Sequence, residues 1–545
     1  MNVSVCLILS VASLVLLPLF AWALPDQPAL DMFLQCLSNH TQPSNPIYES
    51  IYTPKYNSSF QSVLTAYVKN RRFLTAETPK PLAIVAAKHE SHVQATVICA
   101  KGSGLQLRIR SGGHDYEGLS YTSTVPFVIL DMFNLRFIDI DITNQTAWVQ
   151  AGATLGELYY KISNTSKLHG FPAGICPYLG VGGHFSGGGY GNMMRKYGLS
   201  VDNVVDAQIV DDEGRILDRK LMGEDLFWAI RGGGGTSFGV ILSWKIKLVR
   251  VPEKVTVFKI KKMLEQGATD VVHQWQKVAH TLPEDIFIRV MPMVVNGSHE
   301  EGREKTVSVF FIGMFLGQTK SLIPLMKRSF LELGIQVRDC KEMSWVESVV
   351  FWADFPDGTP VDVLLDRPKK ARDSFKSKSD YVKTVIPKEG LEKIWKKMID
   401  LRVNNIFMQW NPYGGRMSEI SESETAFPHR TGNLFKIQYL TSWVGDEGNI
   451  NVTNRYMNEL RDFYASMASY VSSDPREAFL NYRDLDIGSN ISCNQTSFRE
   501  AELYGFKYFK GNFQRLMKVK AKVDPQNFFK NEQSIPPQTT SVYNR

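Results

Sequence analysis

The chain is 545 residues long, with 43% hydrophobic and 21% charged residues and a formal net charge of +7. This is the composition of a globular protein, and the length predicts about two or three structural lobes. Lysine and arginine are scattered among aspartate and glutamate and form no basic stripe. We therefore expect no nucleic-acid partner.

The N-terminus has the features of a secretory signal peptide. Residues 3–20 are apolar and precede Ala21-Trp22-Ala23, the small-x-small pattern that signal peptidase requires. A membrane anchor is the alternative, but Pro18 interrupts the run, which is short for a bilayer span. No later segment is long and apolar enough to cross a membrane. We expect a signal peptide over residues 1–23, no membrane span after cleavage, and delivery through the secretory pathway to the extracellular space or the vacuole.

Two further features agree with secretion. N-glycosylation sequons are spread along the whole chain, at Asn39, Asn57, Asn144, Asn164, Asn296, Asn451, Asn490 and Asn494. The cysteines that remain after removal of the leader are Cys36, Cys99, Cys176, Cys340 and Cys493. Because their number is odd, at least one is unpaired or has a chemical role.

The first part of the mature chain, residues 24–252, has the pattern of a nucleotide-binding domain made of βα pieces. The residues over 92–101 carry the apolar stripe of a helix. Short apolar strands are predicted over residues 83–85, 105–109, 127–130, 147–149 and 204–210.

After Pro252 the pattern becomes that of a second domain, over residues 253–474. This domain is predicted to be an antiparallel sheet with helices on one face. The strands are expected over residues 255–259, 286–293 and 307–315, and the amphipathic helices over residues 320–333 and 391–398. Residues 475–545 are expected to return to the first domain, with disorder only after Gln538.

Three glycine-rich stretches lie in the first domain, at residues 110–116, 180–191 and 231–236. Glycine permits positive φ, and successive N–H groups can form an anion-binding nest suited to a diphosphate. None of the stretches ends in Gly-Lys-Ser/Thr, which excludes a Walker loop, and all of them match the Rossmann fingerprint poorly. Tight turns without a ligand are the alternative for any single stretch, but three together favour a nucleotide site.

Five motifs occur in a combination that identifies a family. They are Ser-Gly-Gly-His-Asp-Tyr-Glu-Gly over residues 111–118, Gly-Ile-Cys-Pro over 174–177, Trp-Ala-Ile-Arg and four glycines over 228–235, Asn-Tyr-Arg-Asp-Leu-Asp over 481–486, and the ending over 523–536. In this combination, from about Cys36 to the C-terminus, the chain resembles the berberine-bridge-enzyme-like family of plant FAD-linked oxidases.

The resemblance implies an α+β fold of the vanillyl-alcohol-oxidase type, in which an α+β substrate domain is inserted into a two-subdomain FAD-binding domain. It also implies FAD attached twice, through His114 to the 8α-methyl group and through Cys176 to C6 of the flavin. An imidazole and a thiolate are nucleophiles suited to these positions. The alternatives are a hydrogen-bonded loop histidine and a small buried cysteine. The family's N-terminal disulfide matches Cys36 and Cys99, and no metal site is implied.

The same resemblance gives the other residues expected to contact the cofactor. Leu179 matches a position that gates access of oxygen to the flavin, where leucine accompanies slow reaction with oxygen. The full set is Arg110, Ser111, Gly112, Gly113, Asp115, Leu179, Gly180, Gly183, His184, Gly187, Gly188, Tyr190, Gly191, Val240, Asn481 and Tyr482.

The resemblance places catalysis on Tyr482, Lys436, Gln438, Tyr116 and Tyr190. Flavin oxidation of a substrate needs a base for the accompanying proton, and a phenol with a pKa near 10 needs a neighbouring positive charge to act as one. Lys436 and Gln438 alternate on a predicted strand and would share a face. The berberine bridge enzyme itself has a glutamate base where this chain has Gln438, which argues against its carboxylate-assisted ring closure.

A strand over residues 285–293 is expected to supply substrate contacts. Phe287, Arg289 and Met291, with Met293, would point to one side and form an apolar wall with one cation. Arg289 could bind a phenolate or carboxylate, or take part in a structural ion pair.

The favoured function is oxidation of a small molecule by removal of hydride from an allylic or benzylic C–H of a plant phenolic, prenylated phenol, alkaloid or alcohol, with ring closure as an option. We expect a monomer that uses O2 or another electron acceptor. Three alternatives remain at this point: an FAD-containing enzyme of [4+2] cycloaddition, an oligosaccharide oxidase, and a non-catalytic glycoprotein.

Overall fold

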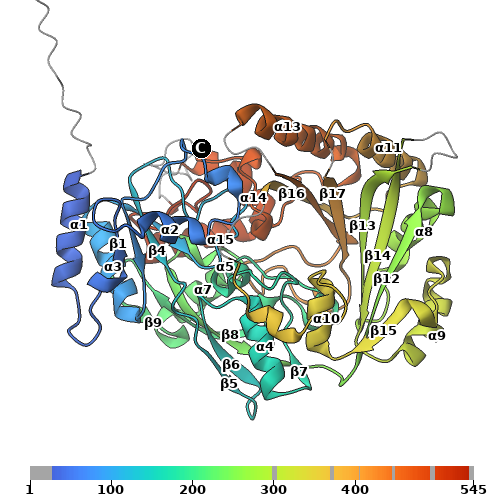
Figure 1. The fold of residues 1–545 in the computed structure, drawn as a ribbon, viewed down its shortest axis with the longest axis horizontal. Helices are drawn as coiled ribbons and strands as arrows, with labels where there is room; N and C mark the ends of the chain where they lie inside the picture. Colours follow the sequence, from blue (N-terminus) through green and yellow to red (C-terminus); the bar gives the residue numbers. More distant parts are fainter. Residues whose placement is uncertain are drawn as a thin grey trace, which may run out of the picture.

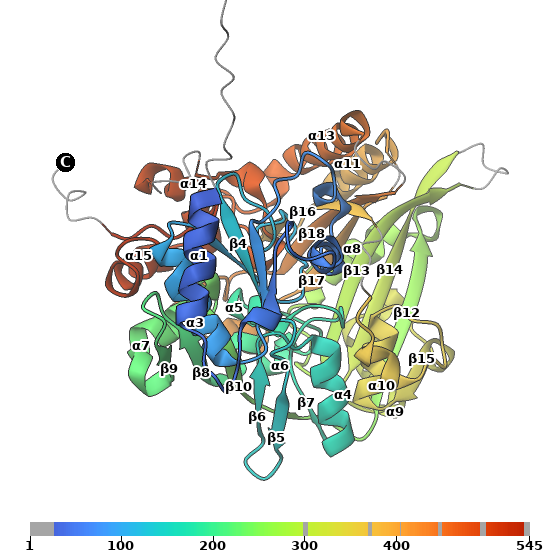
Figure 2. The same ribbon diagram turned by 60° about the vertical axis from the view of Figure 1, so that its left-hand side comes forward.

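The computed structural model describes residues 27–297, 304–368, 373–403, 405–444, 449–490 and 497–538. The predicted signal peptide, Cys493, Asn494 and the segment after Gln538 lie outside these ranges. In the described part of the chain, no helix is both long and apolar enough to cross a bilayer. Two sheet-containing halves lie side by side (Figures 1 and 2).

The first sheet has four strands in the order β1-β2-β4-β3. They are β1 (Ile51–Tyr52), β2 (Ala83–Ala86), β4 (Phe127–Asp131) and β3 (Gln106–Arg110). β2 and β3 run parallel to β4, and α3 (Glu90–Gly102) connects β2 to β3. This is the βα arrangement that the sequence predicts. The chain leaves β3 at Arg110, and Ser111 and two glycines follow.

The second sheet has five strands in the order β5-β6-β10-β8-β9. They are β5 (Ile138–Asp141), β6 (Thr146–Gln150), β10 (Val240–Lys247), β8 (Val204–Val210) and β9 (Ile216–Leu217). All of their pairings are antiparallel. The prediction of βα pieces is therefore wrong for this sheet. The four-residue turn between β5 and β6 is too short for a parallel crossover, so it permits only antiparallel pairing.

The remaining elements of this half connect or cover the two sheets. A two-stranded ribbon pairs β11 (Val249–Arg250) with β7 (His169–Gly170). The helices are α1 (Gln27–Asn39), α2 (Phe60–Ala66), α4 (Leu155–Thr165), α5 (Val181–Ser186), α6 (Met194–Tyr197) and α7 (Arg219–Ile230). Thr154 and Glu157 form a capping box that begins α4.

The third sheet forms the other half and has seven strands in the order β15-β12-β14-β13-β17-β18-β16. They are β15 (Cys340–Met343), β12 (Val255–Met263), β14 (Lys305–Phe315), β13 (Ile286–Asn296), β17 (Ile406–Pro412), β18 (Phe435–Trp443) and β16 (Ser374–Val382). Every pairing in it is antiparallel, as predicted.

The two faces of the third sheet have different partners because side chains alternate along each strand. On β13, Ile286 and Ile288 join the core formed with the covering helices, whereas Phe287 joins the core of the first half. The covering helices are α8 (Ala268–Val278), α9 (Thr319–Ser329), α11 (Lys388–Ile399) and α13 (Ile450–Ser466), which lie on the outer side of the sheet (Figure 1). The opposite face of the sheet thus looks toward the first half.

The predicted helix over residues 320–333 is shorter than expected. α9 ends at Ser329 because Phe330 has a non-helical backbone, with φ −155° and ψ 62°. A single 3-10 turn, Leu331–Leu333, follows.

The C-terminal segment packs on the first half, as expected from the sequence. Its helices are α14 (Phe498–Phe509) and α15 (Asn512–Val523). Phe513 and Leu516 of α15 are buried in the same core as Trp228 of α7. Lys520 is fully buried, pairs with Asp524 and donates to the carbonyl oxygen of Ser237. The remaining helices are α10 (Trp345–Trp352) and α12 (Arg416–Glu419).

The predicted disulfide joins Cys36 of α1 to Cys99 of α3. It ties the N-terminal helix to the first sheet over a separation of 63 residues. Cys176 and Cys340 are free cysteines in the described part of the chain.

Candidate active site

A cavity of about 410 Å³ lies between the first half and the inner face of the third sheet. Its walls come from the loop after β3, the segment around α5, strands β13, β17 and β18, and residues 479–483. Segments that are hundreds of residues apart in the sequence thus meet at one site.

The loop after β3 depends on glycine to reach the cavity. Gly113 has φ +68°, and a Cβ atom there would collide with the carbonyl oxygen of Tyr67. A Cβ atom on Gly112 would collide with the backbone nitrogen of Gly180. Only glycine allows the two glycine-rich stretches to approach each other this closely, which brings His114 to the cavity wall.

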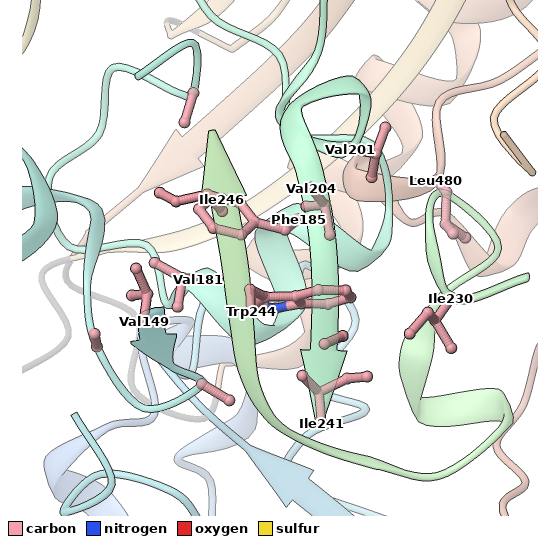
Figure 3. Packing of buried hydrophobic residues seen from close by; sticks show 14 of the residues in the cluster. Val149, Val181, Phe185, Val201, Val204, Ile230, Ile241, Trp244, Ile246 and Leu480 are labelled. Carbon is pink, nitrogen blue, oxygen red and sulfur yellow. The ribbon is translucent and has the colours of Figure 1, made fainter. Parts of the chain in front are cut away.

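The second glycine-rich stretch is supported by a hydrophobic core beneath it. Phe185 of α5 packs beside Trp244 of β10, with ring centroids 6.4 Å apart. Val181, Val204 and Leu480 belong to the same cluster (Figure 3). Because Leu480 is also part of this core, the segment that carries Tyr482 is anchored to the first half.

His114 and Cys176 line the same cavity. Burial, with a contribution from Lys69, lowers the pKa of His114 to about 3, so the imidazole is neutral near pH 7. No group among the described residues hydrogen-bonds to its Nε2 atom. Burial raises the pKa of the Cys176 thiol, while backbone N–H groups of Tyr178 and Leu179 oppose that rise.

Three tyrosines gather at the side of the cavity that faces the third sheet. The hydroxyl groups of Tyr190 and Tyr482 are hydrogen-bonded to each other. The ring of Tyr482 stands nearly perpendicular to that of Tyr116, with centroids 5.9 Å apart. Gln438 donates from Nε2 to the hydroxyl of Tyr116 at 3.0 Å. β18 and three segments of the first half thus build one cluster.

Lys436 lies directly behind these rings. Its Nζ atom is 3.3 Å from the ring centroid of Tyr190, 3.6 Å from that of Phe479 and 4.8 Å from that of Tyr482. It has no hydrogen-bond partner among the described residues. Burial, followed by repulsion from Arg289, lowers the pKa of Lys436 well below its ordinary value, and burial raises the pKa of Tyr482.

Arg289 is the cation that β13 contributes to the cavity. Its Nε atom donates to Oδ1 of Asn411 at 2.7 Å, and its guanidinium lies 5.2 Å from the ring centroid of Trp352. The hydrogen bond to Asn411 uses only one of the five N–H donors of arginine. The other donors suit an oxygen atom of a substrate.

Most of the predicted site residues line this cavity. They are Ser111, Gly112, Gly113, His114, Asp115, Tyr116, Cys176, Leu179, Gly180, Gly183, His184, Gly187, Tyr190, Gly191, Arg289, Gln438, Asn481 and Tyr482.

Six predicted residues do not belong to the lining. Arg110 instead pairs with Asp131 and donates to the carbonyl oxygen of Leu64. Phe287 packs against Trp352, with ring centroids 5.9 Å apart. The other four are Gly188, Val240, Met291 and Lys436, of which Lys436 contacts the rings of Tyr190, Phe479 and Tyr482 in the cavity wall.

The prediction missed several lining residues. Gln409 of β17 lies opposite Gln438 in the strand register, and Leu440 lies two residues after Gln438 on the same face of β18. The polar side chain of Gln409 within an apolar strand was the available signal. Arg108 of β3 and, in the C-terminal segment, Lys530 and Asn531 also line the cavity.

The residues at this cavity fit FAD. Nε2 of His114, which has no hydrogen-bond partner among the described residues, and the thiol of Cys176, which is in no disulfide, face one cavity. Arg108 has buried Nε and Nη1 atoms that find no partner among the described residues. Such donors suit an anionic group such as the diphosphate of FAD.

Comparisons with known proteins agree with this geometry. Residues 81–219 match the model of an FAD binding domain, and residues 478–536 match that of the "berberine and berberine like" family. Berberine bridge enzyme-like 4 of Arabidopsis thaliana is 58% identical over 97% of this chain and 98% of its own.

Two solved structures are similar over the same length. BBE-like #28 from Arabidopsis thaliana is 45% identical, with a TM-score of 0.87 over 93% of this chain and all of its own. Phl p 4, a grass pollen allergen with glucose dehydrogenase activity, is 41% identical, with a TM-score of 0.85 over 93% of this chain and 99% of its own. An isoleucine-to-valine variant of Phl p 4 is described as a glucose oxidase.

Proposed function

The chain belongs to the berberine bridge enzyme-like family of FAD-linked oxidoreductases, and on this premise we propose that it oxidises a plant phenolic, prenylated phenol, alkaloid or alcohol at an allylic or benzylic carbon. The observation that carries the proposal is the cluster of Tyr482, Tyr190 and Lys436 at the same cavity as His114 and Cys176. A proton acceptor and the cofactor-binding nucleophiles thus share one site.

The proposal includes FAD attached through both His114 and Cys176. His114 is kept neutral by burial and has a free Nε2 atom, which is the form of imidazole that can form a covalent bond. Two attachments would hold the cofactor without a closed pocket and leave the side of the third sheet open to the substrate. When bound, FAD supplies the acceptor for the hydride.

The proton released with the hydride goes to Tyr482 and Lys436 as a pair. An alcohol that loses hydride from carbon and a proton from oxygen becomes a carbonyl, so one base is required. A neutral tyrosine beside a neutral lysine holds the same number of protons as a phenolate beside an ammonium. The pair therefore accepts one proton in either form. Tyr190, hydrogen-bonded to Tyr482, orients the phenol.

Arg289 and Gln438 orient the substrate in this proposal. Arg289 presents N–H donors for a phenolate, hydroxyl or carboxylate oxygen, while Asn411 holds its Nε atom. Gln438 donates to Tyr116 and to Ser377, which leaves its carbonyl oxygen as an acceptor at the cavity. Leu179 lines the cavity and would restrict oxygen, so we propose an acceptor other than O2 as the main oxidant.

Oxidation of a sugar is the second candidate, because Phl p 4 has glucose dehydrogenase activity. The polar side chains of Gln409, Gln438 and Arg289 could bind sugar hydroxyls. For both candidates we propose that the protein is a monomer and that it is exported, with removal of the signal peptide after Ala23.

Anaerobic mixing of the purified protein with phenols, alcohols and sugars tests the choice. We expect flavin absorbance to bleach with a benzylic or allylic alcohol and not with glucose. Bleaching with glucose alone would select the second candidate. Conversion of a substrate without bleaching would contradict both and indicate a redox-neutral reaction such as a cycloaddition.

A further inference from the structure

A group of buried charges lies behind the tyrosines and takes no part in the proton transfer. It consists of Lys376 and Lys378 of β16 with Glu117, Asp484 and Asp486, and we call it the ionic cluster. The side chains of Lys376, Lys378, Glu117 and Asp484 are at most 4% exposed.

Lys376 joins the two loops that carry Tyr116 and Tyr482. Its Nζ atom contacts Oε1 of Glu117, the residue after Tyr116. The same atom lies 2.6 Å from Oδ1 of Asp484, two residues after Tyr482. One ammonium group thus holds a carboxylate from each loop.

Further contacts fix the same two loops to each other. Lys378 lies 2.7 Å from Oδ2 of Asp484 and 2.8 Å from Oδ2 of Asp486. The backbone N–H of Leu485 donates to Oε1 of Glu117 at 3.2 Å. The cluster therefore leaves the carboxylates little freedom to change partners.

Fold stability alone does not explain such a cluster. Removing charges from water costs free energy, and well-packed apolar residues often replace a buried ion pair without loss of stability. A set of fixed charge-assisted hydrogen bonds instead defines one geometry. The geometry defined here is the perpendicular arrangement of the rings of Tyr116 and Tyr482.

We propose that the ionic cluster is a positioning device in which Lys376, held between Glu117 and Asp484, sets the relative position of the phenols of Tyr116 and Tyr482 for catalysis. These three are positioning residues, since they act through the tyrosines. The inference rests on the proposed function, because it matters only if Tyr482 accepts the substrate proton.

The test is Lys376→Met, which keeps the length of the side chain and removes its charge. In folded, FAD-loaded protein we expect the limiting rate of anaerobic flavin reduction to fall about 100-fold, as for a misplacement of about 1 Å. The substrate concentration for half-saturation should change little. Asp524→Asn is the matched control, because it breaks another fully buried ion pair of the first half, the one between Asp524 and Lys520. It should lower the melting temperature and leave the limiting rate unchanged.

A limiting rate in Lys376→Met equal to that of Asp524→Asn would overturn the proposal. If Lys376→Met does not fold, Lys378→Met decides, since Lys378 contacts Asp484 and Asp486 but not Glu117. A tenfold lower limiting rate supports the proposal, and a wild-type rate overturns it. Tyr482→Phe is measured in parallel. A wild-type limiting rate in Tyr482→Phe would contradict the proposed function itself. A slow rate in Tyr482→Phe, together with wild-type rates in the variants of Lys376 and Lys378, would contradict only this inference.

Discussion

The hydroxyl groups of Tyr190 and Tyr482 are hydrogen-bonded to each other although 292 residues separate them in the chain. Tyr190 follows the glycine-rich segment around α5, and Tyr482 ends a 3-10 turn, Leu480–Tyr482, at the start of the C-terminal segment. Leu480, at the start of this turn, belongs to the same hydrophobic core as Phe185 of α5 (Figure 3). The geometry of the phenols is therefore a property of the whole fold.

Tyr482→Phe should slow anaerobic flavin reduction by roughly 100-fold or more, because it removes the oxygen that receives the substrate proton. FAD should remain bound, since the substitution leaves His114 and Cys176 intact. Rapid-mixing absorbance at saturating substrate measures the rate. Tyr504→Phe is the control, because Tyr504 is also buried but donates to Ser534 in the C-terminal segment. Equal rates in the two variants would remove Tyr482 from its role.

Lys436→Met should move the pH dependence of flavin reduction. Burial lowers the pKa of Lys436 well below 10.5, so in the wild type the pair gains its proton-accepting form as pH rises through that lowered pKa. Activity is therefore lost at low pH and reaches a plateau below the ordinary lysine range. Without the lysine, Tyr482 must ionise alone, and burial raises its pKa above 10. The rise in the limiting rate should shift to higher pH; an unchanged midpoint would contradict the pairing.

His114→Ala combined with Cys176→Ala should yield protein from which acid releases all FAD. Each single variant should keep one covalent bond and stay yellow after denaturation and washing. The visible flavin absorbance of the washed polypeptide checks this. Cys340→Ala, at the other free cysteine of the described residues, should behave like the wild type. Flavin that is released from the wild-type protein would refute covalent attachment.

Leu179→Val should accelerate reoxidation of the reduced flavin by oxygen, by about tenfold for the loss of one methylene group at a narrow passage. Mixing reduced enzyme with air-saturated buffer measures the rate. Ile175→Val, at another apolar residue of the cavity, should leave the rate unchanged. Equal acceleration in both variants would show a general effect of cavity size.

Much of the candidate site could be predicted because its signals are local. The alternation in residues 435–439 places Lys436 and Gln438 on one face of β18, and the structure has them there. The glycines of residues 112–113 predicted a sharp turn, which Gly113 makes with φ +68°. Motif and periodicity suffice when a residue's role depends on its near neighbours.

Other parts of the site depend on partners that are remote in sequence. Lys376 and Lys378 alternate with serines, a pattern typical of a solvent-exposed edge strand, yet both are buried. Their burial follows from Glu117 and Asp484, which lie 259 and 108 residues away from Lys376. The resemblance predicts that Arg110 contacts the cofactor, but its side chain pairs with Asp131 on the neighbouring strand β4. Such pairings depend on the register of whole sheets.

The walls of the cavity begin near residue 107 and are completed only by residues 530–531. During synthesis the ribosome must therefore release nearly the entire chain before a complete FAD site exists. Domains generally fold as they emerge from the ribosome, but the first half cannot complete its fold until residues 530–531 have been synthesised. A chain that ended between Cys176 and Tyr482 would carry His114 and Cys176 without the proposed proton acceptor.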